Sequence, residues 1–435
     1  MSEAVGEPAH CRVLVIMGSG ETSPTMVTIH KALAGRLGAG SHRAVLLDTA
    51  YAFQENASDI SARAQAYFAR SVGLKVGVVS DADLPQEQNP EAPAALAAIR
   101  SADWVFAGPG SPSYALARWR GGPVADALRE RIAAGAGITV IASAAAAAIG
   151  FVAVPVYEIY KVGADPHWLE GLDLFSVLGM KVAVIPHYDN AEGGTHDTRF
   201  CYLGERRLAI LERELPEDAA VLGVDEHTAL IIDLARAQAE VVGRGGATVR
   251  KNGVSTVLPA GTAARLDELR AIVRSGTRFR SRSAGGEGAT GGTTTPPGDQ
   301  DQLGRALNDV TTDAEGRFDA ATKHRDSATM VAAILDLEAA IEAWSTDTDE
   351  NDDSDRARAV LRGLVTRLGR AADQGLTGPA DRMRPALEPL VALRDTLRAR
   401  RAYADADVIR EALAAAGVEL RDTPDGTRWE VSRAS

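Results

Sequence analysis

The sequence is poor in cysteine, with only Cys11 and Cys201 among its 435 residues. Two cysteines are too few for a disulfide scaffold or for a four-cysteine zinc site, so both of these classes are excluded. The spacing of the His, Cys and carboxylate residues indicates no other kind of metal site. We therefore expect no cofactor.

Long apolar runs and excess positive charge are also lacking. The longest apolar stretch, around residues 138–156, is interrupted by Ser143, Gly150 and Pro155, and the chain opens without a charged and then apolar leader. We therefore expect no membrane span, no signal peptide and a cytoplasmic location. The formal net charge of −12 argues against a general nucleic-acid or membrane-surface binder, although it leaves room for a local basic patch.

Short apolar, β-branched runs recur through the first part of the chain. The first five lie at 12–18, 44–50, 75–81, 103–110 and 138–143, and stretches with helical periodicity such as 60–73 and 123–135 separate them. Nearly continuous apolar strands that alternate with helices predict a mainly parallel sheet with helices on both faces. Further strands are expected at 181–190, 220–225 and 228–233, then a hairpin-like region at 239–261 and a closing helix at 263–273. We assign residues 1–275 to one α/β domain.

The composition changes after residue 275. Residues 276–302 contain the Gly-, Ser-, Thr- and Pro-rich stretch 281–301, which has almost nothing to bury, so we expect a disordered linker. Residues 303–435 are predicted to form a separate all-α bundle that ends in a small β-hairpin. Its amphipathic helices are expected at 327–344 and 355–372, joined by an acidic loop at 345–355. A longer helical stretch at 385–417 then ends at Gly417, and the hairpin at 418–431 pairs Val418 and Leu420 with Trp429 and Val431.

Residues that can carry chemistry lie at the ends of the predicted strands. Reactive groups of open α/β sheets gather at the carboxyl ends of the strands. Gly108 and Gly110 lie in a loop before a helix, where glycine lets backbone N–H groups approach a ligand. Ser143 lies at a strand-to-helix turn, where its hydroxyl is expected to be accessible. His187 ends a strand as a candidate general base, and Asp225 and Glu226 follow another strand as candidates to orient it.

These segments resemble a known family. The segments "PHYDNAEGGTHDTRF" (186–200) and "GVDEHTALIID" (223–233), with the Gly-rich loop and the late "GRGGATVRKNG" (243–253), are similar to peptidase family S51, the cyanophycinases and aspartyl dipeptidases. The resemblance covers roughly residues 10–275. It implies a flavodoxin-like, class I glutamine amidotransferase-like fold and amide hydrolysis through an acyl-enzyme. The implied roles are nucleophile for Ser143, base for His187, orienting acid for Glu226 rather than Asp225, and oxyanion-hole donors for the N–H groups of Gly110 and Ala144.

The turn around Ser143 departs from the family pattern, which has glycine two residues before and two residues after the serine. Here these positions are Ile141 and Ala145. A branched side chain at the crowded base of this turn is expected to cost about 1–3 kcal/mol unless its neighbours yield. The Ala-rich helix that follows Ser143 is one form of compensation, and loss of the reactive turn is the alternative.

Each candidate residue also has a purely structural interpretation. Ser143 then serves as a small residue between helix and sheet, His187 as a hydrogen-bonded core histidine, and Glu226 as the cap of a strand end. We expect His196 to be exposed, Cys201 to lie in a helix, and Asp165, His167 and Trp168 to belong to a surface loop. Because neither cysteine lies at the turn, a thiol amidotransferase is not expected.

The C-terminal part resembles a second family. Residues 404–431, "ADADVIREALAAAGVELRDTPDGTRWEV", are similar to the end of cysteinyl-tRNA synthetases, and residues 317–341 are similar to the helical bundle through which those enzymes contact tRNA. The HIGH and KMSKS signatures and a zinc-ligand set are lacking, so we do not expect aminoacylation. The candidate contacts to tRNA phosphates are Arg394, Arg398, Arg401 and Arg410.

Two hypotheses follow from the sequence. The first is a serine-type peptidase or hydrolase that acts on a peptide or amide substrate and is fused to a tRNA-synthetase-like helical module. The second is a catalytically inactive pseudoenzyme that binds tRNA or a protein partner. The oligomeric state stays open, with a homo-oligomer among the possibilities.

Overall fold

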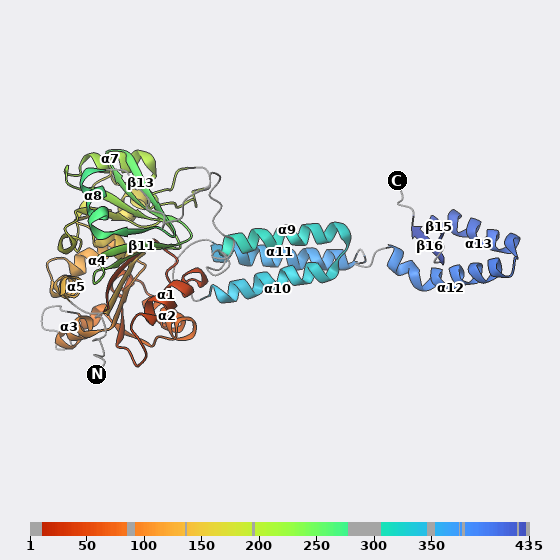
Figure 1. Ribbon diagram of the computed structural model, residues 1–435, viewed down its shortest axis with the longest axis horizontal. Coiled ribbons are helices and arrows are strands. Elements are labelled where there is room, and N and C mark those ends of the chain that lie inside the picture. The colour runs from red at the N-terminus through yellow and green to blue at the C-terminus, as the bar shows by residue number, and fades with distance from the viewer. Residues whose placement is uncertain are drawn as a thin grey trace, which may run out of the picture. The chain divides into compact units, whose positions relative to one another are not determined.

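The computed structural model describes residues 11–84, 92–134, 137–193, 196–276, 306–345, 353–373, 375, 379–423 and 426–431. The chain forms two compact units (Figure 1). The first unit consists of residues 1–306 and 343–351, and the second unit of residues 307–342 and 352–435. Nearly all of the predicted linker at 276–302 and most of the predicted acidic loop at 345–355 lie outside the described residues.

The first half of the first unit alternates between strands and helices, as predicted. Its elements are β1 (Arg12–Met17), α1 (Val27–Gly35), β2 (Ala44–Leu47), α2 (Ala57–Tyr67), β3 (Val76–Val79), α3 (Ala92–Ser101), β4 (Trp104–Ala107), α4 (Pro112–Trp119), α5 (Pro123–Ala134), β5 (Gly137–Ala142) and α6 (Ser143–Ala148).

The second half of the first unit is richer in strands. Its elements are β6 (Val152–Ala153), β7 (Leu169–Glu170), β8 (Val182–Ile185), α7 (Gly204–Arg213), β9 (Ala220–Val224), β10 (Thr228–Asp233), β11 (Gln238–Gly243), β12 (Gly246–Lys251), β13 (Val254–Pro259), β14 (Ala263–Arg265) and α8 (Leu266–Ser275).

The main sheet has eight strands in the order β14-β11-β10-β1-β5-β4-β2-β3. Strands β1 to β5 are parallel to one another, whereas β10 is antiparallel to β1, and β11 and β14 continue the sheet in antiparallel fashion. In this sheet, helices connect the first five strands in sequence, as parallel pairing requires. The predicted α/β class is therefore confirmed, and its later strands add an antiparallel half to the sheet.

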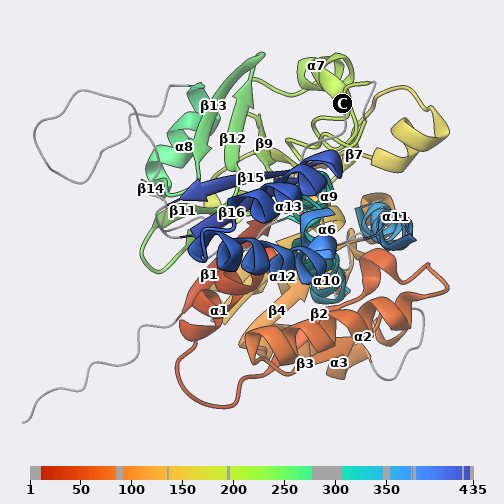
Figure 2. The same cartoon turned by 90° about the vertical axis from the view of Figure 1, so that its right-hand side faces the viewer.

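A second sheet holds the two strands that lead to the predicted base and acid. Its order is β13-β12-β9-β8, in which β8 and β9 are parallel and Ile185 pairs with Gly223. Figures 1 and 2 show α7, α8 and β13 on one side of the first unit and α1, α2 and α3 on the other. Because β8 and β9 are parallel neighbours, the residues after them emerge at the same edge.

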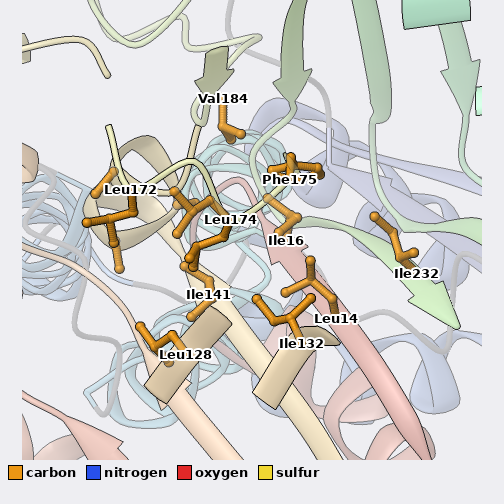
Figure 3. Close-up of a cluster of buried hydrophobic side chains, with 14 of the residues drawn as sticks. Leu14, Ile16, Leu128, Ile132, Ile141, Leu172, Leu174, Phe175, Val184 and Ile232 are labelled. Atoms are coloured by element: carbon orange, nitrogen blue, oxygen red, sulfur yellow. The ribbon is translucent and has the colours of Figure 1, made fainter. Parts of the chain in front are cut away.

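The main sheet is buried on both faces. In β1, Leu14 and Ile16 belong to one apolar cluster, while Val13, Val15 and Met17 belong to another on the opposite face. Alternate side chains of a strand point to opposite faces, so a continuous apolar run fills both. Figure 3 shows part of the first cluster, in which Leu14, Ile16, Ile141 and Leu174 lie together.

The second unit is helical apart from a terminal hairpin, as predicted. It contains α9 (Leu307–His324), α10 (Ser327–Ala343), α11 (Asp353–Asp373), α12 (Pro379–Ala399), α13 (Tyr403–Ala415), β15 (Val418–Thr423) and β16 (Gly426–Val431). The helical stretch expected at 385–417 is two helices, which separate where Arg401 takes a positive φ of 62°. The hairpin register pairs Val418 with Val431 and Leu420 with Trp429, as the alternating apolar residues predicted. Among the described residues, every helix is too short or too polar to serve as a membrane span.

Candidate active site

Ser143 lies at a sharp turn between a strand and a helix. It directly follows β5 and is the first residue of α6. Its φ of 45° falls in the left-handed region, which is rare for residues other than glycine. Strain of this kind occurs where the surrounding structure holds a side chain in a required direction.

The side chains of Ser143, His187 and Glu226 form a continuous hydrogen-bonded chain. Ser143 Oγ lies 3.0 Å from His187 Nε2, and His187 Nδ1 lies 2.9 Å from Glu226 Oε1. His187 comes two residues after β8, with a φ of 48°, and Glu226 comes two residues after β9. The parallel pairing of β8 and β9 therefore delivers the imidazole and the carboxylate to the same edge, where the imidazole reaches the serine.

The charge of Glu226 decides the direction of these hydrogen bonds. Burial raises the pKa of Glu226, but the hydrogen bond and charge of His187 and the hydrogen bond of Asn190 outweigh burial and leave the pKa below its ordinary value. Glu226 is thus an ionised acceptor near neutral pH, so His187 Nδ1 carries the proton and donates it. Nε2 then carries the lone pair that can accept the Ser143 hydroxyl proton, which is the arrangement that a general base requires.

Two neighbours of His187 also reach the loop that carries Glu226. The Asn190 side chain is fully buried, and its Nδ2 donates to Glu226 Oε1 at 3.1 Å. The backbone N–H of Glu226 donates to Asp189 Oδ1 at 2.7 Å. Neither residue was singled out from the sequence. Both belong to the polar run that directly follows the strand β8, which is the signal that could have identified them.

Asp225 has a different role from Glu226. Its Oδ2 accepts the backbone N–H of Gly246 at 2.7 Å and so fixes the start of β12. Burial, followed by the charge of Asp189, raises the pKa of Asp225 to about 6. Of the two acids that follow β9, only Glu226 is hydrogen-bonded to the imidazole.

The loop that contains Gly108 and Gly110 is connected to α6, the helix that begins at Ser143, by a backbone hydrogen bond. The Ala145 N–H donates to the carbonyl oxygen of Gly108 at 3.1 Å. Gly110 has a φ of 126°, and a Cβ at this position would overlap the carbonyl group of Ala50, so only glycine fits. Ala144 lies in the first turn of α6, where backbone N–H groups have no partner within the helix.

Ile141 and Ala145, which replace the glycines on either side of Ser143, both fit into the core. Ile141 is completely buried in the apolar cluster of Figure 3, beside Leu174 and Leu128. Ala145 is also fully buried, and its N–H still reaches Gly108. The bulk at Ile141 therefore fills the core and leaves the hydrogen bond between Ser143 and His187 in place.

A group of aromatic side chains lies beside the imidazole. The ring of Tyr202 is 6.4 Å from that of His187 and 5.0 Å from that of Tyr160, which in turn stacks with His196 at 6.3 Å. The Tyr202 hydroxyl donates to Glu192 Oε2 at 2.6 Å. His196 is exposed.

Cys201 does not lie in a helix, so that expectation was wrong. Phe200, Cys201 and Tyr202 all have positive φ values, and α7 begins only at Gly204. This left-handed turn is held by the loop after β8, since the N–H groups of Phe200 and Cys201 donate to the carbonyl oxygens of Tyr188 and His187. Burial raises the pKa of the Cys201 thiol to about 12, which leaves the thiol protonated.

The remaining candidates lie away from this chain of hydrogen bonds. Cys11 precedes β1, and Asp165 and His167 are exposed, while Trp168 donates its indole N–H to the carbonyl oxygen of Leu211. Among the described residues, no group of three or more His, Cys, Asp or Glu is arranged to hold a metal ion.

The four arginines predicted to contact tRNA have unlike surroundings. The Arg394 side chain is fully buried, and its guanidinium group binds Asp422 at 2.7 Å, so it fixes the hairpin to α12 and does not present a surface charge. The expectation that Arg394 faces a phosphate therefore disagrees with its position. Arg398 lies 3.4 Å from Asp422, whereas Arg401 and Arg410 are exposed.

Comparison with known proteins links the two parts of the chain to different families. The model of peptidase family S51 matches residues 14–239, which is slightly more than half of the 435 residues. The crystal structure of a peptidase from an acI-B1 Actinobacterium shares 21% identity, covering 60% of this chain and 98% of that one, with a TM-score of 0.48. A putative peptidase E protein from Listeria monocytogenes shares 16% identity over 54% of this chain and 98% of its own, with a TM-score of 0.35.

The other part of the chain is similar to cysteine–tRNA ligases. The ligase of Frankia casuarinae is 36% identical over 123 residues, which cover 21% of this chain and 24% of the ligase. The ligase of Halorhodospira halophila is 46% identical over 81 residues, 18% of each protein. The chain thus spans a quarter or less of the length of these relatives.

Proposed function

This chain belongs to peptidase family S51, and on that premise we propose that its first unit hydrolyses peptide or amide bonds through an acyl-enzyme on Ser143. The observation that carries the proposal is the hydrogen-bonded chain from Ser143 through His187 to Glu226. A serine hydroxyl is a weak nucleophile until a neighbouring base accepts its proton, and a third group must hold that base in one tautomer.

In the first half of the reaction, Ser143 Oγ forms a bond to the carbonyl carbon of the substrate. His187 Nε2 takes the hydroxyl proton, and the carbonyl electron pair moves to the oxygen. The imidazolium that results is stabilised by the negative charge of Glu226 across 2.9 Å. When the carbon–nitrogen bond breaks, Nε2 gives its proton to the leaving nitrogen, and the acyl group stays on Oγ.

The oxygen that becomes negative needs hydrogen-bond donors. We assign this role to the backbone N–H groups of Gly110 and Ala144. This assignment is supported by the hydrogen bond from Ala145 N–H to Gly108, which connects the loop of Gly108 and Gly110 to α6. It is also supported by the backbone conformation of Gly110, which only glycine can adopt. Such donors stabilise the transition state because the negative charge develops on the carbonyl oxygen to which they donate hydrogen bonds.

In the second half, water replaces the leaving amine. His187 Nε2 takes a proton from water as the water oxygen bonds to the acyl carbon. The proton then returns to Ser143 Oγ as the ester bond breaks, which releases the acid and regenerates the enzyme. His187 therefore acts first as a base and then as an acid in each half of the reaction.

The proposal is tested by digesting an unbiased peptide library, supplemented with aspartyl dipeptides, with the full-length protein. New amino termini are read by mass spectrometry. Cleavage should disappear in Ser143→Ala and His187→Ala and persist in Ser41→Ala, which replaces an exposed serine of the same unit. Cleavage that survives Ser143→Ala would come from another residue, and a wild-type protein that cleaves nothing would favour the pseudoenzyme.

Contact of the second unit with tRNA is a second candidate function. It is supported by the similarity of this part of the chain to cysteine–tRNA ligases and by the exposed side chains of Arg401 and Arg410. Binding through phosphates should weaken as salt rises. The test is a gel-shift titration of tRNA at low and moderate salt with the double variant Arg401→Glu and Arg410→Glu.

The matched control for this titration is the double variant Arg70→Glu and Arg274→Glu, which makes the same charge change at exposed sites of the first unit. Weaker binding in the first double variant alone supports the tRNA contact. Equal binding by both variants, or no binding by the wild type at low salt, contradicts it and leaves a scaffold or partner-docking role for the second unit.

A further inference from the structure

The loop after β8 sends three side chains toward the residues that follow β9. His187 donates to the Glu226 carboxylate, Asp189 accepts the Glu226 backbone N–H, and Asn190 donates to the same carboxylate oxygen as His187. Side chains of this single loop therefore bind both the backbone N–H and the carboxylate of Glu226. The imidazole and the carboxylate cannot shift independently of that loop.

Asn190 occupies the centre of this arrangement. Its side chain is completely buried, and both ends of the amide are used: Nδ2 donates to Glu226 Oε1 at 3.1 Å, and Oδ1 accepts the Glu192 N–H at 3.3 Å. Its backbone N–H donates to the His187 carbonyl oxygen at 3.2 Å, and its own carbonyl oxygen accepts the Thr198 hydroxyl at 3.4 Å. One residue thus contacts the base through the backbone and the acid through the side chain.

We propose that Asn190 is a positioning residue for the proposed hydrolysis, because it fixes the Glu226 carboxylate in the orientation that holds His187 ready to accept the serine proton. Its side chain hydrogen-bonds Glu226 and the backbone of Glu192, so it acts on the reaction through Glu226. The inference rests on the proposed function for its effect on rate, but the geometry of Asn190 and Glu226 is independent of that function.

The chemistry of the surroundings explains why an amide is needed at this position. Glu226 is flanked by the carboxylates of Asp189 and Asp225, and the histidines His187 and His227 are the neighbouring groups that can carry positive charge. Another carboxylate at position 190 would repel Glu226, and an apolar side chain would leave Oε1 with one donor fewer in a buried place. A neutral donor adds a second hydrogen bond to Oε1, which limits rotation of the carboxylate about its own axis.

The test uses Asn190→Ala and Asn190→Asp in the full-length protein, with Asn56→Ala and Asn56→Asp as matched controls at an exposed position. The readout is the rate at which a fluorophosphonate probe labels Ser143. Both Asn190 variants should react about tenfold to a hundredfold more slowly, the range expected for loss of a hydrogen bond to a charged group. The controls should react like the wild type.

A double-mutant comparison separates positioning from general damage to the fold. In a Glu226→Gln background, Asn190→Ala should have little further effect on labelling, because the group through which it acts is already altered. Equal losses in both backgrounds would overturn the proposal. Thermal melting is recorded for every variant, and Asn190→Ser replaces Asn190→Ala in the same comparison where the alanine variant does not fold.

A second readout does not depend on activity. The pKa of His187, followed by NMR of histidine-labelled protein and assigned with His187→Gln, should rise in Asn190→Asp by about half a unit or more, because the added negative charge favours the imidazolium. An unchanged pKa together with wild-type labelling would overturn the inference. If the wild type itself does not label, the proposed function fails, and the NMR shift still decides whether Asn190 sets the environment of Glu226 and His187.

Discussion

Ile141 and Ser143 lie two residues apart where β5 ends, yet they meet different surroundings. The side chain of Ile141 is fully buried in the apolar core, whereas the hydroxyl of Ser143 lies 3.0 Å from His187 Nε2. The bulk that replaces glycine before the serine is therefore taken up by the core and does not displace the serine from the imidazole.

Because Ile141 fills the core, shortening it should reduce stability without improving the reactive turn. Ile141→Ala is expected to lower the free energy of unfolding by about 2–5 kcal/mol, the range for removal of a buried aliphatic side chain. The measurement is urea denaturation, with fluorophosphonate labelling of the folded variant alongside. A variant that is as stable as the wild type, or one that labels faster, would show that Ile141 obstructs the turn instead of supporting it.

The backbone of Gly110 should tolerate no side chain. In Gly110→Ala the new methyl group meets the carbonyl group of Ala50, so the loop must move away from Ser143. We expect labelling and hydrolysis to fall by roughly a hundredfold, which is the loss typical when an oxyanion donor is removed. Gly121→Ala is the control, since Gly121 also has a positive φ but has open space around it. Equal losses in the two variants would mean that strain alone, and not the place of Gly110, matters.

The two acids after β9 should respond differently to neutralisation. Glu226→Gln removes the charge that stabilises the imidazolium, so labelling of Ser143 should fall about a hundredfold or more. Asp225→Asn retains an oxygen that can accept the Gly246 N–H and has no hydrogen bond to His187, so labelling should stay near the wild-type rate. The opposite ranking of the two variants would assign the orienting role to Asp225.

The buried imidazole of His30 should make the first unit sensitive to acid. Burial lowers the pKa of His30 from 6.5 to about 3. Between these two values the unfolded chain binds a proton that the folded chain does not, so stability falls as the pH falls through this window. From pH 7 to pH 5 this amounts to about 2 kcal/mol.

His30→Leu should remove this part of the pH dependence, while His167→Leu, at an exposed histidine, should leave it unchanged. Urea denaturation at pH 7 and pH 5 gives the comparison. If the two variants lose the same stability between these pH values, the buried imidazole does not contribute to acid sensitivity.

Much of the fold followed from local patterns in the sequence. The first five strands are apolar on both faces, as in Val13 to Met17, and that pattern alone indicates a parallel sheet covered by helices. The terminal hairpin was also predictable, because Val418 and Leu420 alternate in step with Trp429 and Val431. The break between α12 and α13 at Arg401 could not be predicted, because no glycine or proline marks it in the sequence.

The candidate site depends on contacts between distant segments, which limits what the sequence can say. The positions of Ser143, His187 and Glu226 at strand ends could be read from the pattern, but their distances depend on the pairing of β8 with β9 in a separate sheet. The polar residues after β8 looked alike in the sequence, and only the fold distinguishes Asn190, which is buried against Glu226, from His196, which is exposed. Arg394 was predicted to be exposed for the same reason, because its partner Asp422 lies 28 residues further along the chain.

The role of Ser143 as the nucleophile can be tested by locating the residue to which a fluorophosphonate probe becomes attached. The intact protein is treated with the probe, digested and mapped by mass spectrometry, with His187→Ala and Ser41→Ala in parallel. We predict one adduct, on Ser143, that forms at the same rate in Ser41→Ala and is nearly absent in His187→Ala. If the folded wild-type protein acquires no adduct on Ser143, or if His187→Ala acquires the adduct equally fast, Ser143 is not a nucleophile activated by His187.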